Sequence, residues 1–122
     1  GHAWITSKDA LEVVDVSNPS APVHKGSLVN GQGGALLNQP QSIAIQGNYA
    51  YIASKGSNAL EIIDISNPAA PVHVSSLQDG QGGANLLRPE SVVVRGSYAY
   101  VVGENGFEVV DISNPAAPVH AG

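Results

Sequence analysis

The sequence predicts an all-β fold made of β-propeller blades, each a four-stranded antiparallel sheet. The first reason is a repeat of about 49 residues that runs through the 122-residue chain. The second is that each full repeat contains four short apolar segments separated by Gly, Asn, Ser and Pro. The third is that none of these segments has the length or the 3.6-residue period of a helix. Four strands per 40–50 residues is the signature of propeller blades, whereas a β-sandwich needs no repeated sequence.

The repeat is visible in three aligned segments. They read ALEVVDVSNPSAPVHKGSL at 10–28, ALEIIDISNPAAPVHVSSL at 59–77 and GFEVVDISNPAAPVHAG at 106–122. Asp15, Asp64 and Asp111 occupy equivalent positions, 49 and then 47 residues apart. We therefore treat 1–122 as a single propeller region with repeats at about 1–47, 48–96 and 97–122. The last repeat is incomplete. We expect about 2.75 blades, made up of the second to fourth strands of one blade, a full second blade and most of a third.

Strands are expected at four places in the central repeat: 42–46, 49–54, 60–65 and 72–77. Gly47-Asn48 separates the first two, and both residue types tolerate the positive φ of a tight hairpin turn. Ser66-Asn67-Pro68 ends the third strand, because Pro cannot donate a ladder hydrogen bond and Asn and Ser side chains bond nearby backbone.

These residues also carry a family resemblance. YAYIA at 49–53 followed by ALEIIDISNPAAP at 59–71 resembles the LVIVP-type propeller repeat of bacterial and archaeal proteins, many of them exported or at the cell surface. The resemblance covers essentially the whole chain. It implies propeller blades and an extracellular or cell-surface location, and it provides no catalytic residues to carry over.

The amino-acid composition excludes several classes of partner and site. Hydrophobic residues make up 43% of the chain and charged residues 12%, which excludes a disordered chain. The net charge is −5 and the five basic residues are scattered along the sequence, so no basic patch and no nucleic-acid partner are expected. No apolar run approaches the ~18 residues of a membrane span, so no membrane insertion is expected. The absence of cysteine excludes disulfides and thiolate metal sites.

A closed ring needs at least about four blades. An open arc would expose apolar blade faces. We therefore expect that self-association, or the remainder of a longer propeller, closes the ring.

The Gly-rich loops are the candidate binding site. If 42–46 is the innermost strand, the connections 54–58 and 103–106 share one face with the long loops 29–39 and 78–88. Function concentrates on such loops of a rigid scaffold. Glycan, peptide or calcium binding would use four polar residues: Asn30, Gln32, Asp79 and Gln81. The alternative is a loop that needs Gly only for its backbone conformation. Replacing Gln81 by Ala is then expected to leave stability almost unchanged. Neither loop has the Lys-Ser/Thr of a P-loop, so nucleotide binding is not expected.

Three sets of repeated polar residues could form catalytic or metal sites, but structural roles explain them more simply. The aspartates are expected to accept hydrogen bonds at turns. The glutamates are expected at a solvated strand edge or in local pairs, with a cation-binding ring as the alternative. The histidines are expected in structural or surface roles, with zinc binding as the alternative. The sets are Asp15, Asp64 and Asp111; Glu12, Glu61 and Glu108; and His24, His73 and His120. Repeated residues argue against a unique catalytic set, so we expect no catalytic residues, no metal and no cofactor.

The function expected from the sequence is that of a non-catalytic scaffold or binding module for a protein or glycan, outside the cell or at its surface. One alternative is lectin-like glycan binding through the GQGG loops. The other is that the chain is part of a propeller enzyme whose active site lies elsewhere, because one propeller scaffold hosts many functions.

Overall fold

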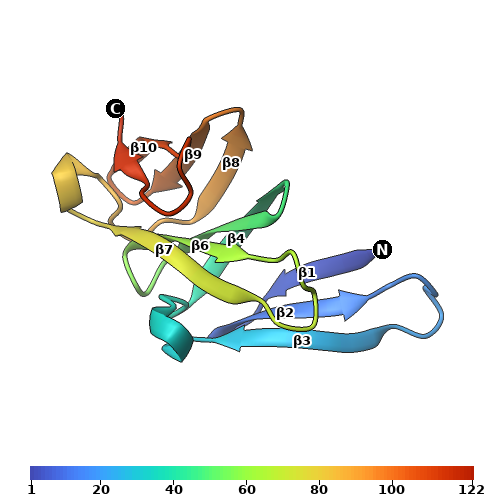
Figure 1. The fold of residues 1–122 in the computed structure, drawn as a ribbon. Coiled ribbons are helices and arrows are strands. Elements are labelled where there is room, and N and C mark those ends of the chain that lie inside the picture. The colour runs from blue at the N-terminus through green and yellow to red at the C-terminus, as the bar shows by residue number, and fades with distance from the viewer.

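A computed structural model describes all 122 residues and confirms the all-β prediction. Three antiparallel sheets follow one another along the chain and fan out in space (Figure 1). The first contains β1 (His2–Thr6), β2 (Ala10–Asp15) and β3 (Val23–Val29). The second contains β4 (Pro40–Gln46), β5 (Tyr49–Ser54), β6 (Ala59–Asp64) and β7 (Val72–Gln78). The third contains β8 (Ser91–Arg95), β9 (Tyr98–Gly103), β10 (Gly106–Asp111) and β11 (Val119–His120). These sheets are propeller blades.

Each blade is an up-and-down meander, in which every strand pairs with the next strand along the chain. In the central blade the four predicted strands all form, with ends that differ from the prediction by two residues or fewer. Two 3-10 turns, η1 (Gln32–Gly34) and η2 (Gln81–Gly83), lie in the loops between blades. Neither turn is long or apolar enough to cross a membrane as a helix.

Turn residues set the blade shape as the sequence predicts. Gly47 begins the β4–β5 hairpin turn with φ 59°, a conformation that suits glycine. After β6, the Asp64 carboxylate accepts the backbone N–H of Ser66 at 2.8 Å, and Asn67 accepts that of Ala69 at 3.1 Å. Hydrogen bonds from Ser66 hold the pKa of Asp64 below its usual value. Asp15 and Asp111 make the same turn contact, so the predicted turn role of the aspartates is confirmed.

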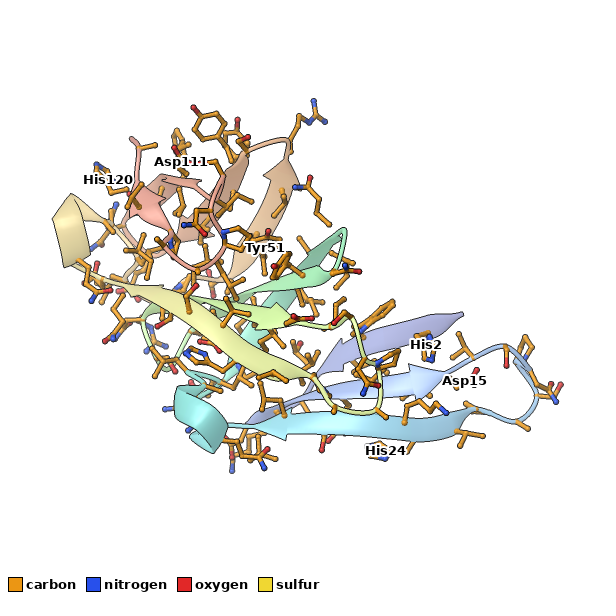
Figure 2. The ribbon with its side chains drawn as sticks, in the orientation of Figure 1. His2, Asp15, His24, Tyr51, Asp111 and His120 are labelled. Carbon is orange, nitrogen blue, oxygen red and sulfur yellow. The ribbon has the colours of Figure 1, made fainter.

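Apolar side chains fill the space between neighbouring blades. Between the first and second blades the buried cluster includes Leu11, Ile52 and Ile63. Between the second and third it includes Tyr51 and Leu60, and Figure 2 shows Tyr51 in the space between these two sheets. The stability of the molecule therefore resides largely in interfaces between successive blades.

The third blade exposes the face that its predecessor buries. Tyr51 of the second blade is 2% exposed against the third blade, but its equivalent Tyr100 is 40% exposed. Phe107, which is equivalent to the buried Leu60, is also exposed. The two faces are built from the same repeat positions. Of these two blades, the second has a following blade packed on this face and the third does not.

A bulge in the outer strand receives the turn of the next blade. The register of β2 and β3 shifts between Val13 and Val14, and β6 and β7 shift at the equivalent place. Gly26, beside the first bulge, lies directly against the backbone of Pro68 and Ala69 in the second blade. At the equivalent position Ser75 donates its hydroxyl to the carbonyl of Pro115 in the third blade. The Ser-Asn-Pro turns thus serve as contacts between blades as well as strand ends.

Candidate functional site

The connections on one side of the blades form a continuous loop face, here defined as 30–39, 55–58, 79–88 and 104–105. Backbone hydrogen bonds tie these connections to one another. Lys55 N–H donates to Gln39 at 3.1 Å, and Asp79 N–H donates to Asn58 at 2.8 Å. Both 3-10 turns lie on this side, at the left of Figure 1. The grouping of loops expected from the strand order is therefore confirmed.

The four predicted site residues all make hydrogen bonds within their own loops. Asn30 Oδ1 accepts Leu37 N–H at 2.8 Å, and Asp79 Oδ1 accepts Leu86 N–H at 2.9 Å. Gln32 and Gln81 each accept the N–H of the residue three positions earlier at 2.7 Å. These bonds give all four residues a structural role and use one oxygen of each. Ligand binding by them stays a prediction.

The glycines of these loops are needed for the backbone path. Gly31 and Gly80, before the two 3-10 turns, have φ 92° and 88°. Gly33 and Gly34 and their equivalents also have positive φ, so three glycines in each loop occupy the left-handed region. Side chains other than glycine adopt this region at a cost. The structural explanation of the GQGG pattern therefore accounts for its glycines.

A buried glutamate, paired with a partly exposed histidine, lies under each of these loops. Glu61 on β6 is 0% exposed. Its Oε1 accepts Leu36 N–H at 3.1 Å, and its Oε2 pairs with Nδ1 of His73 on β7. In the third blade Glu108 accepts Asn85 N–H at 3.0 Å and pairs with His120. Figure 2 shows His120 beside the η2 loop. Each pair thus fastens an incoming loop to the blade that it enters.

The first blade shows what the loop contributes. Glu12 Oε2 and His24 Nε2 are 3.0 Å apart, but no loop crosses over them and the two side chains are 35% and 63% exposed. Figure 2 places His24 on the outer edge of the molecule. In the second blade the loop packs so closely that Gly34 lies against the His73 ring. Burial raises the pKa of Glu61, although its hydrogen bonds to His73 and Leu36 oppose the shift.

These pairs correct one expectation from the sequence. The glutamates do pair locally, but Glu61 and Glu108 are not at a solvated strand edge. The alternative of a glutamate ring is not what the geometry shows, because each glutamate faces the histidine of its own blade. No three metal-ligating side chains come together. The overlooked signal was the constant spacing of 12 residues from glutamate to histidine in all three copies.

A polar pocket of about 620 Å³ opens on the loop face, near the start of β4. None of its lining residues is hydrophobic and none is acidic. The lining comprises Thr6, Ser7, Lys8, Gln39, Pro40, Gln41, Lys55 and Arg88. Three of the five basic residues of the chain therefore gather here, whereas the sequence suggested that they were scattered.

Backbone contacts place the three cations. Gln39 N–H donates to the Lys8 carbonyl at 2.9 Å, which joins the β1–β2 turn to the loop before β4. Lys55 N–H donates to the Gln39 carbonyl, so Lys8 and Lys55 flank the same loop residue. Arg88, in the loop before β8, is the equivalent of Gln39, and both have positive φ, 49° and 53°. No sequence motif could have revealed this gathering, because Lys8 and Lys55 lie in turns of the first and second blades and Arg88 lies in the loop that leads into the third.

A second pocket of about 400 Å³ lies between the second and third blades at their outer strands. It is lined by Gln81, Gly82 and His120 together with residues of β7 and of the turn before β11. One of the four predicted site residues thus borders a hollow that a ligand could enter.

The comparisons with known proteins agree with the repeat architecture. The family model described as the LVIVD repeat matches residues 1–29, 39–79 and 89–122. No curated protein matches the chain. A crystal structure of a functionally unknown protein from Desulfotomaculum acetoxidans DSM 771 is similar in fold, with a TM-score of 0.74 and 18% sequence identity. The similarity covers 96% of this chain and 35% of that protein.

The three family matches fall on the three blades, so the family predicted from the sequence is confirmed, with LVIVD in place of LVIVP as its name. The chain belongs to the LVIVD-repeat family.

Proposed function

We propose that the chain is a non-catalytic scaffold and binding module that contacts another macromolecule, a protein or a glycan, through its loop face. One observation carries this proposal. The repeated polar side chains that could perform chemistry are used to hold the fold together, in the same way from blade to blade. Asp64 closes a turn, and Glu61 with His73 fastens a loop. Equivalent residues do the same in the third blade.

The loop face suits binding because its backbone is held firmly. Hydrogen bonds cross between connections, and a buried glutamate anchors each long loop. Binding residues are commonly presented by loops on such a rigid scaffold. Pre-organised loops also lose less conformational freedom when a partner binds. The resemblance to exported propeller proteins supports a location outside the cell or at its surface.

The test places a photo-crosslinking amino acid at either end of the blades in the full-length protein, expressed in its native cells. Ser57, which is half-buried, represents the loop face. Ser20, which is exposed, represents the turns at the opposite end of the blades. A discrete crosslinked partner from position 57 and none from position 20 is the expected result. Equal crosslinking from both positions, or none from either, would contradict the proposal. Protease accessibility on intact cells checks the location.

Glycan binding is the second candidate, and the pocket that contains Gln81 favours it. A glycan array probed with the full-length protein, and with its Gln81→Ala variant, tests this role. Absence of binding across the array would remove it. Hydrolase or lyase activity toward an array glycan would instead favour the propeller-enzyme alternative.

A further inference from the structure

The basic residues of this acidic chain are distributed in an unusual way. The chain has ten acidic and five basic residues and a net charge of −5. Yet the polar pocket on the loop face is lined by Lys8, Lys55 and Arg88 and by no acidic residue. From the convergence of these three cations on one polar pocket, we propose that the pocket binds an oxyanion, that is, a carboxylate, phosphate or sulfate group. The proposal rests on the binding role argued above and gives that role a ligand chemistry.

The donors in the pocket match this chemistry. An arginine side chain offers a planar fork of N–H groups to two oxygens, and a lysine offers a compact charge. Lys8 lies within ion-pair distance of no carboxylate, so its charge is free to meet a ligand. The Lys55 side chain is 25% exposed, and a partly buried charge is screened less by salt than an exposed one.

Two carboxylates near the pocket pair with the other two cations. Lys55 pairs with Glu90 at 3.1 Å, and Arg88 pairs with Glu104 at 3.0 Å. Both glutamate side chains are 57% exposed. Ion pairs of this exposed kind contribute little stability. An incoming oxyanion can therefore replace Glu90 or Glu104 at modest cost, and these glutamates act as built-in competitors.

The overall charge makes the inference specific. A net charge of −5 repels anions in general, so diffuse attraction would not bring an oxyanion to this protein. Binding would have to depend on the pocket cations themselves. The two remaining basic residues, Lys25 and Arg95, do not line the pocket and provide matched controls.

The experiment titrates the full-length protein with inorganic pyrophosphate, sulfate and tricarballylate by calorimetry at low and moderate salt. The three probes distinguish phosphate, sulfate and carboxylate as the preferred group. Lys8→Gln and Arg88→Gln should each weaken binding by roughly tenfold or more, the usual effect of losing a charge-assisted hydrogen bond. Lys25→Gln and Arg95→Gln change the net charge equally and should leave affinity within about twofold.

Glu90→Gln gives the sharpest readout. If Glu90 competes with the ligand for Lys55, its replacement should strengthen binding of the probe, whereas if Glu90 only stabilises the fold, the affinity should not increase. No binding of any probe to the unaltered protein would overturn the proposal. Equal losses in the pocket and control variants would also overturn it. Either failure would leave the proposed binding function standing, because the crosslinking experiment tests it separately. A partner can dock on the loop face without placing an anion in the pocket.

Discussion

Glu61 and His73, twelve residues apart, meet across β6 and β7 beneath the loop that enters their blade. The second oxygen of the same carboxylate accepts Leu36 N–H from that loop. One buried side chain therefore joins two strands and the connection from the previous blade. The arrangement recurs at Glu108 and His120, so the repeat carries its own loop anchor.

We expect Glu61→Ala to lower the free energy of unfolding by roughly 3 kcal/mol, because it leaves the half-buried His73 without its partner and Leu36 N–H without an acceptor. Denaturant unfolding of the full-length protein measures this change. Glu104→Ala is the control. Its side chain is 57% exposed in its pair with Arg88, so the expected loss is about 1 kcal/mol or less. Similar losses for both variants would mean that the loop does not bury the pair.

Glu61 should also make stability depend on pH. Burial raises its pKa in the folded state above the ordinary value of 4.5, so the folded protein binds this proton more tightly than the unfolded chain does. The stabilisation linked to this proton is therefore fully present below pH 4.5 and is lost as pH rises through the raised folded pKa. Unfolding curves of the unaltered protein and Glu61→Gln should diverge within this window. Parallel curves would show that Glu61 has an ordinary pKa.

Asp64 should act in the opposite direction. Hydrogen bonds from Ser66 lower its folded pKa below the usual 3.8. Its contribution is present above pH 3.8 and is lost as pH falls through the lowered folded pKa. Asp64→Asn keeps an oxygen to accept Ser66 N–H but removes the titration, so it should flatten the acid side of the stability curve. An unchanged acid limb in this variant would contradict the shift.

The sequence alone predicted the blades, their strands and the turn roles of the aspartates, because these are local properties recorded in the repeat. The loop face followed from strand order. The basic pocket did not. Lys8, Lys55 and Arg88 are brought together only by the packing of successive blades, and Arg88 stands where the preceding copy has Gln39. The burial of Glu61 was also missed, because in a strand a charged residue ordinarily marks the solvent face. Glu61 is buried because the loop that contains Leu36 crosses over it, and this loop position cannot be read from the strand itself.

The hydrogen bond of Gln81 changes the result expected when it is replaced by Ala. Gln81 Oε1 accepts Gln78 N–H at 2.7 Å at the start of the loop, so the loss should be about 1 kcal/mol rather than none. Gln81→Glu, which retains an acceptor oxygen, is the companion variant and should lose less. Thermal unfolding compares the two. If Gln81→Ala is as stable as the unaltered protein, the contact is incidental and the side chain is free for a ligand.

Ile63 tests the interface between the first two blades. It is 0% exposed and belongs to the cluster with Leu11 and Ile52. Ile63→Ala should cost about 2–5 kcal/mol, the usual range for removing a large buried aliphatic side chain. Val72→Ala, on the exposed start of β7, should change stability by about 0.5 kcal/mol or less. A loss below about 1 kcal/mol for Ile63→Ala would mean that the blades do not pack as described.

Gly26 tests how closely one blade can approach the next. A Cβ at this position would lie 2.7 Å from the Pro68 carbonyl oxygen and 2.8 Å from the Ala69 carbonyl carbon. Both are backbone atoms, so the turn of the second blade would have to move. We expect Gly26→Ala to cost about 1–3 kcal/mol, the usual effect of overpacking.

Ser75 provides the comparison, because it occupies the equivalent position and its Cβ is already accommodated against the third blade. Ser75→Ala should lose only the hydrogen bond to the Pro115 carbonyl, about 1 kcal/mol. Gly26→Ser should recover part of the loss caused by Gly26→Ala if its hydroxyl can reach Pro68 as Ser75 reaches Pro115. If Gly26→Ala proves as stable as the unaltered protein, the first interface can widen freely, and the close approach at Gly26 is not what fixes the spacing of these blades.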